Sequence, residues 1–128
     1  MTLAEARVTT VDGCRLACDI EGPDEAPACL LLHSLGTTSE LWAPQRERFR
    51  RVFRLIRYDA RGHGRSQPPV GPYTLGRLGR DALAVLDAAG VDHAHVCGVS
   101  LGGLTALWLG VHAPDRVGRI VAANTAAR

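Results

Sequence analysis

A chain of 128 residues, 46% of them hydrophobic and with a formal net charge of +2, has the size and composition of one globular domain. No apolar stretch is long enough to cross a membrane. All fifteen basic residues are arginine, and several cluster between residues 46 and 57. Glutamate and apolar residues interrupt this cluster, which favours a solvated helix face followed by a strand over a nucleic-acid surface.

The predicted elements begin with an antiparallel hairpin, because Val8–Val11 and Arg15–Ile20 alternate in polarity around Asp12-Gly13. Ala28–Leu32 is a continuous apolar run, as expected of a strand buried on both faces. The later elements are predicted as a helix from Pro44 to Arg50, a strand over Phe53–Tyr58, a loop over 61–72, a helix capped by Thr74 and running to Ala89, a strand over His95–Val99, a helix over Leu101–His112 and a strand over Val117–Ala122. This alternation predicts an α/β fold with a mostly parallel sheet and helices on both faces.

The N-terminus and the cysteines indicate a cytoplasmic protein. Residues 1–7 lack the basic start and apolar core of a signal peptide. Cys14 and Cys18 would lie about 13 Å apart along one strand, too far for a disulfide. Cys29 and Cys97 fall in apolar runs typical of a core, and the sequence has no Cys-x-x-Cys pair for zinc or redox chemistry.

Ser100 lies in the segment Gly98-Val-Ser-Leu-Gly102, a Gly-x-Ser-x-Gly motif between a predicted strand and a predicted helix. A strand that turns so sharply into a helix leaves no room for a Cβ at either glycine and places the serine at the apex. We therefore predict that Ser100 is a nucleophile and that the backbone N–H of Leu101, at the helix N-terminus, is an oxyanion donor. The alternative is a glycine-rich turn that carries a serine by chance.

The second oxyanion donor is expected in the segment His33-Ser-Leu-Gly-Thr37, which follows the apolar strand. In α/β folds with a Gly-x-Ser-x-Gly turn between a strand and a helix, one donor comes from the residue after the nucleophile. The other donor comes from the loop after the third strand. The backbone N–H of Leu35 is the candidate. His33 is interpreted as a strand-end histidine that holds this loop by hydrogen bonds, rather than as a catalytic base.

Several segments together carry a resemblance to a known family. They are His33-Ser-Leu-Gly-Thr37, Trp42, the RYDARGHGRS run from Arg57 to Ser66, Gly71-Pro-Tyr-Thr-Leu75, Gly98-Val-Ser-Leu-Gly-Gly103 and Ala123-Asn-Thr125. On these segments the sequence resembles the α/β-hydrolases over nearly its whole length, and within them the 3-oxoadipate enol-lactonases. Ser34 stands where many members of the family have glycine, and the enol-lactonase branch accepts serine there.

The resemblance implies a hydrolase without a cofactor that opens 3-oxoadipate enol-lactone, a small molecule formed in the breakdown of aromatic compounds. Ser100 would attack the lactone carbonyl, a histidine would take its proton, and an acid would orient that histidine. The N–H groups of Leu35 and Leu101 would hold the oxyanion, and water would release the product from an acyl-enzyme. Trp42 is expected either to line the substrate pocket or to pack in the core.

The catalytic acid and histidine of this family follow the serine, and this chain holds only His112 and Asp115 after Ser100. The predicted helix puts them about 18 Å from Ser100. We therefore expect a truncated α/β-hydrolase fold, in which residues 1–128 form the N-terminal part of a single domain without its lid and C-terminal strands. Such a chain is expected to be inactive alone and to self-associate through the apolar edge strand at Val117–Ala122.

Two other groups of residues are interpreted as structural. Asp59 and His63 follow a predicted strand and are expected to form a hydrogen-bonded turn rather than a catalytic pair. His93 and His95 share one strand face, but a metal site would need further ligands, so no metal is expected. The open alternatives for function are a carboxylesterase, a haloperoxidase-like enzyme without a cofactor, and a non-catalytic fragment or interaction module.

Overall fold

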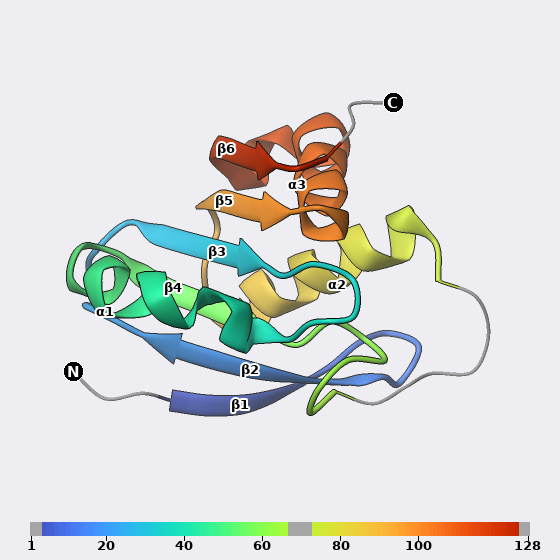
Figure 1. The fold of residues 1–128 in the computed structure, drawn as a ribbon, viewed down its shortest axis with the longest axis horizontal. Coiled ribbons are helices and arrows are strands. Elements are labelled where there is room, and N and C mark those ends of the chain that lie inside the picture. Colours follow the sequence, from blue (N-terminus) through green and yellow to red (C-terminus); the bar gives the residue numbers. More distant parts are fainter. Residues whose placement is uncertain (1–3, 67–72, 126–128) are drawn as a thin grey trace.

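The strands form one sheet in the order β1-β2-β4-β3-β5-β6 (Figure 1). The computed structural model describes residues 4–66 and 73–125. The strands are β1 (Ala4–Thr9), β2 (Arg15–Glu21), β3 (Ala28–Leu32), β4 (Arg54–Tyr58), β5 (Ala94–Val99) and β6 (Val117–Ala123). β2 pairs antiparallel with β1 and β4, whereas β4, β3, β5 and β6 run parallel. The predicted, mostly parallel sheet with an opening antiparallel hairpin is confirmed.

The hairpin forms where it is predicted, but its first strand begins and ends earlier in the chain than the predicted Val8–Val11. β1 ends at Thr9 because the turn begins at the next residue. Thr10 N donates to Cys14 O at 2.8 Å, and Thr10 Oγ1 accepts from Cys14 N at 3.1 Å. Val11, predicted as part of the strand, is instead 99% exposed at the turn.

Helices cover both faces of the sheet, α1 on one face and α2 and α3 on the other (Figure 1). They are α1 (Ala43–Val52), α2 (Leu75–Ala88) and α3 (Leu101–His112), with short 3-10 turns η1 (Ser39–Trp42) and η2 (Pro114–Arg116). Thr74 caps α2 as predicted, because its Oγ1 accepts from Arg77 N at 3.0 Å. α3 has the predicted bounds, since the chain leaves the helix at Ala113, before Pro114.

The clustered arginines lie on α1 and β4. Arg46 pairs with Glu21 of β2, and Arg50 and Arg51 pair with Glu47 one turn earlier in α1. The predicted helix face followed by a strand is therefore confirmed, although α1 continues to Val52, two residues past the predicted end.

The core lies on both sides of the sheet. Leu30 and Leu109 have no exposed surface and belong to the cluster between the sheet and the helices α2 and α3. Leu31 lies with Leu55 and Trp42 in a second cluster on the face that α1 covers. Every residue of β3 is buried, as its apolar run predicts. None of the helices in the described part of the chain is long and apolar enough to cross a membrane.

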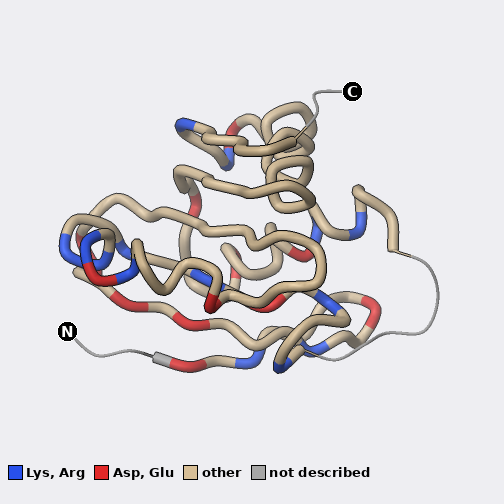
Figure 2. Tube along the Cα trace, viewed as in Figure 1, with Lys and Arg blue, Asp and Glu red and all other residues tan. Residues whose placement is uncertain are grey.

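Charged residues gather on one side of the molecule, around β1, β2, α1 and the loop after β4, whereas β5 and α3 contain no Asp, Glu, Lys or Arg (Figure 2). Residues 59–66 of that loop (the β4 loop) form hydrogen-bonded turns, and residues 67–72 of the predicted loop lie outside the described residues.

Arg61 of the β4 loop is 2% exposed and forms two bidentate ion pairs. Its guanidinium contacts Asp81 of α2 at 2.5 and 2.8 Å, and Asp12 of the hairpin turn at 2.8 and 3.1 Å. The hydrogen bonds to Asp12 and Asp81 raise the pKa of Arg61. Arg77 Nε adds a contact to Asp81 at 3.2 Å. One buried guanidinium therefore ties the hairpin, the β4 loop and α2 together.

The four cysteines, all of them within the described residues, are not joined by disulfides. Cys14, Cys18 and Cys29 are buried, and Cys97 is half-buried. Burial raises the pKa of every one of these thiols, to about 12 for Cys18 and Cys29. The thiols are therefore protonated at neutral pH.

Candidate active site

Ser100 stands at the apex of a sharp turn between β5 and α3, the elbow formed by residues 98–102. Its backbone has φ 55° and ψ −114°, a conformation that costs a non-glycine residue about 1–3 kcal/mol. Ser100 N donates to Ala123 O at 2.9 Å, and Ser100 O accepts from Leu104 N at 3.0 Å. Backbone hydrogen bonds therefore hold this strained conformation, and the strand–turn–helix context on which the prediction rests is present. The role of Ser100 as a nucleophile stays a prediction.

The two glycines of the elbow lie where backbone segments come closest. A Cβ on Gly98 would clash with Gly102 O and lie 2.7 Å from Gly103 N. A Cβ on Gly102 would clash with Leu32 O and lie 2.7 Å from His33 O. The predicted steric need for both glycines is confirmed, and the elbow packs directly against the end of β3.

This packing brings the two predicted oxyanion donors to neighbouring segments. Leu101 is the first residue of α3, so its N–H has no acceptor within the helix. Leu35 lies in residues 33–38, the loop that follows β3 (the β3 loop), and it is 69% exposed. Because β3 and β5 are parallel neighbours, both N–H groups lie at the sheet edge where Ser100 stands. Their role as oxyanion donors stays a prediction.

His33 holds the β3 loop, which confirms its interpretation as a structural residue. Its Nε2 accepts from Ala60 N at 2.8 Å, which leaves the ring proton on Nδ1, and Nδ1 donates to Ser34 O at 2.8 Å. Burial lowers the pKa of His33 below its usual value of 6.5, so the ring is neutral at pH 7. Both nitrogens are occupied by backbone groups, and His33 is not placed to act as a base.

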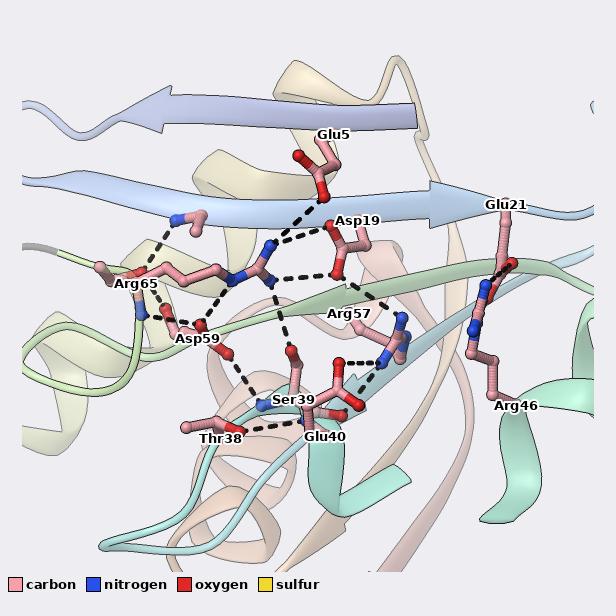
Figure 3. Close-up of polar contacts among 12 residues, drawn as sticks. Glu5, Asp19, Glu21, Thr38, Ser39, Glu40, Arg46, Arg57, Asp59 and Arg65 are labelled. Carbon is pink, nitrogen blue, oxygen red and sulfur yellow. Dashed lines mark hydrogen bonds and ion pairs between the residues drawn. The ribbon is translucent and has the colours of Figure 1, made fainter. Parts of the chain in front are cut away.

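Asp59 and His63 also hold turns, as predicted. One carboxylate oxygen of Asp59 accepts from Ser39 N at 2.8 Å, and the other accepts from Arg65 N and Nε at 3.0 and 3.1 Å (Figure 3). Burial acts to raise the pKa of Asp59, but the hydrogen bonds from Arg65 and Ser39 outweigh it and lower that pKa. Backbone groups occupy both ring nitrogens of His63.

A small cavity lies against the elbow, between residues of β3, β4, α2 and α3. Tyr58 and Asp81 line it together with His33 and Leu101. The sequence analysis assigns no role to Tyr58 or Asp81, although Tyr58 lies in the RYDARGHGRS run. The position of Tyr58 at the carboxyl end of a parallel strand is a signal that could have found it.

Trp42 is not among the residues that line this cavity. It is 6% exposed and packs in the core cluster on the α1 face, where its indole Nε1 has no hydrogen-bond partner among the described residues. The structure thus places Trp42 in the core, and a role in a substrate pocket stays a prediction.

No histidine or carboxylate in the described ranges forms a hydrogen bond with Ser100 Oγ. His112 is the last residue of α3, about 18 Å from the elbow along the helix, and its Nδ1 donates to Trp108 O at 3.1 Å. Asp115 follows in η2. His95 Nδ1 accepts from Arg119 N at 2.9 Å, and the described residues contain no group of three side chains suited to a metal ion.

The sequence profile of the α/β hydrolase fold matches residues 27–127, and the chain therefore belongs to that family. The chain is 44% identical to 3-oxoadipate enol-lactonase 1 of Acinetobacter baylyi over 121 residues, which cover 94% of this chain and 45% of that relative. It is 38% identical to a putative carbamate hydrolase RutD of Caulobacter segnis over 119 residues, 90% of this chain and 44% of that relative.

The structure superposes on the enol-lactonase from Burkholderia xenovorans LB400 with a TM-score of 0.90 at 42% identity, over 98% of this chain and 48% of that one. The predicted α/β-hydrolase fold and the resemblance to enol-lactonases are therefore confirmed. The chain spans about half the length of the relatives that it matches.

Proposed function

We propose that this chain forms the N-terminal half of a hydrolase domain that opens 3-oxoadipate enol-lactone to 3-oxoadipate without a cofactor. The observation that carries the proposal is the strained apex at Ser100, with the N–H groups of Leu35 and Leu101 at the same edge of the sheet. The 44% identity to an enol-lactonase supports a lactone substrate. The reaction would belong to the breakdown of aromatic compounds in the cytoplasm.

In this mechanism Ser100 Oγ attacks the lactone carbonyl carbon, and its proton passes to a histidine that an acid orients. The carbonyl oxygen gains negative charge and is held by the N–H groups of Leu35 and Leu101. The ring C–O bond then breaks, and the histidine returns the proton to the enol oxygen of the acyl chain. Water, deprotonated by the same histidine, attacks the acyl carbon, and the proton passes to Ser100 Oγ as the ester bond to the enzyme breaks. Tautomerisation of the enol gives the ketone of 3-oxoadipate.

The histidine and the acid are expected from a segment C-terminal to this chain, because His112 and Asp115 lie at the far end of α3. We call this chain together with that segment the complete enzyme. A lid and further strands are expected from the same segment.

A substrate panel on the complete enzyme tests the choice of substrate. The proposal expects the highest kcat/KM for an enol-lactone that bears a carboxylate, compared with an uncharged ester and a carbamate. The 38% identity to a putative carbamate hydrolase makes carbamate cleavage the second candidate. A higher kcat/KM for the carbamate or for the uncharged ester would show that the lactone is not the preferred substrate.

Replacing Leu35 by proline is expected to lower kcat by about 10²–10³-fold, because proline lacks the N–H that holds the oxyanion. The matched control, Leu35→Met, keeps the N–H, and its change is expected to stay within about twofold since Leu35 is 69% exposed. Steady-state kinetics on the complete enzyme measures both, with circular dichroism as the folding check. A folded proline variant with normal kcat would contradict the assignment.

The 128-residue chain alone is expected to show no ester turnover and no fast labelling by a fluorophosphonate, because Ser100 lacks a base. We also expect this chain to pair with a second copy through β6. In the described sheet β6 is an edge strand, with β5 as its partner on one side. Light scattering checks this with a matched pair of variants. Val121→Lys on β6 should weaken association, whereas Val52→Lys on α1 should not, although both valines are about equally exposed at 58% and 59%. A monomer with stoichiometric serine labelling would contradict both expectations.

A further inference from the structure

The β3 loop and the β4 loop are joined through two histidine rings. Gly36 N donates to His63 Nε2 at 3.0 Å, and Ala60 N donates to His33 Nε2 at 2.8 Å. The two rings are neighbours, with their centroids 5.1 Å apart. Each bond links residues 27 positions apart in the sequence, at the edge of the sheet where Ser100 stands.

Leu35 lies between two peptide groups that these histidines anchor. Its N–H belongs to the peptide whose carbonyl is Ser34 O, and this oxygen accepts from His33 Nδ1 at 2.8 Å and from Thr37 Oγ1 and N at 2.7 and 3.2 Å. A trans peptide points its N–H opposite to its C=O, so these bonds set the direction of the Leu35 N–H. The next peptide is held by Gly36 N on His63 Nε2. Since Leu35 is 69% exposed, these bonds, rather than packing, fix its position.

His63 is itself fixed as an acceptor. Its Nδ1 donates to Arg61 O at 3.0 Å, which keeps the ring proton on Nδ1 and the lone pair of Nε2 facing Gly36 N. Arg61 is locked in turn by its bidentate pairs with Asp12 and Asp81. The His63 ring is therefore hydrogen-bonded to a part of the β4 loop that is itself bound to the hairpin and to α2.

Resting on the proposed function, we propose that His63 is a positioning residue that aims the Leu35 oxyanion donor through Gly36. It holds the peptide that follows the donor and acts through that backbone, without a chemical step of its own. When Nε2 is absent, this peptide can rotate, and the Leu35 N–H spends less time pointing at the oxyanion. The charge on that oxygen develops in the transition state, so the loss falls on kcat rather than on KM.

In the complete enzyme, His63→Leu is expected to lower kcat by about 10–100-fold with little change in KM. His63→Gln is expected to recover most of this loss, because its Oε1 can accept from Gly36 N. The matched control is His95→Leu, which removes a bond of the same kind, from Arg119 N to His95 Nδ1 at 2.9 Å, at the amino end of β5. This control should lower the unfolding midpoint and keep kcat. An equal loss of kcat in His63→Leu and His95→Leu, or no recovery in a folded His63→Gln, would overturn the inference.

A second readout does not depend on activity. Labelling this chain with ¹⁵N-glycine gives amide signals from its 14 glycines, and Gly36→Ala assigns the signal of Gly36. In His63→Leu this amide proton is expected to move upfield and to exchange faster with solvent, whereas in His63→Gln it stays near its original position. An unchanged Gly36 signal in His63→Leu would overturn the inference even where Ser100→Ala abolishes turnover. Retained turnover in Ser100→Ala would instead overturn the proposed function and leave the Gly36 result standing.

Discussion

Replacing Ser100 by alanine in the complete enzyme is expected to lower kcat for the lactone by at least about 10⁴-fold. The variant lacks the proposed attacking oxygen, so the proposed acyl-enzyme cannot form. Alanine keeps the Cβ at the strained apex of φ 55°, and no hydrogen bond of the described residues involves Ser100 Oγ. The fold is therefore expected to persist, so the loss reports on chemistry.

The measurement is single-turnover hydrolysis of the enol-lactone, with circular dichroism as the folding check. Thr105→Val is the comparison, because it removes a hydroxyl one turn further along α3, where Thr105 Oγ1 donates to Leu101 O at 3.1 Å. The fall in kcat of Thr105→Val is expected to stay below about tenfold, which is the effect of losing one ordinary hydrogen bond. Near-normal turnover in a folded Ser100→Ala enzyme would show that a different group is the nucleophile.

Arg61→Met is expected to lower the free energy of unfolding by about 3–5 kcal/mol, the largest stability effect that we predict for this chain. The Arg61 and Asp81 side chains are only 3% and 2% exposed, so removing the guanidinium leaves a buried carboxylate with Arg77 as its remaining cation. Asp12 loses its bidentate contact at the same time. The hairpin and α2 are then no longer joined through the β4 loop.

Urea unfolding of the 128-residue chain measures this effect, and Arg51→Met is the matched control. Arg51 pairs with Glu47 on the surface of α1, and its side chain is 70% exposed, so its loss should cost less than about 1 kcal/mol. The double variant Arg61→Met/Asp81→Leu should recover part of the loss, because it removes the buried carboxylate as well. Equal effects for Arg61→Met and Arg51→Met would show that the buried network contributes no more than a surface pair.

Elements whose ends are set by local chemistry can be predicted from the sequence. α3 has its predicted bounds because the turn at Ser100 comes directly before its first residue, Leu101, and Pro114 follows its end. Thr74 marks the start of α2 through its side-chain cap. The polarity alternation wrongly predicts that the first strand continues to Val11. The alternation carries no information on the hydrogen bond from Thr10 across the turn, which ends the strand at Thr9. The strand order, with β4 between β2 and β3, depends on pairings between distant segments and has no local signal.

At the candidate site, too, local features can be predicted from the sequence, whereas contacts between distant segments cannot. The elbow is visible in the sequence because its five residues are contiguous and the clash at Gly98 is with Gly102 and Gly103. The close approach of Gly102 to Leu32 and His33 is a contact between distant segments. The sequence predicts that His33 holds the β3 loop, but the contact between His63 and Gly36 has no local signal, because it joins residues 27 positions apart. Such contacts emerge only when parallel strands bring their carboxyl ends to one edge.

The burial of the four thiols has a practical consequence for attaching a reporter dye. A thiol reacts with maleimide as the thiolate, and each native cysteine has a raised pKa that keeps this form scarce at neutral pH. A cysteine introduced at Val11, which is 99% exposed at the tip of the hairpin, would carry an ordinary thiol in open solvent. The hairpin can therefore be labelled at one chosen position while all four native cysteines stay in place.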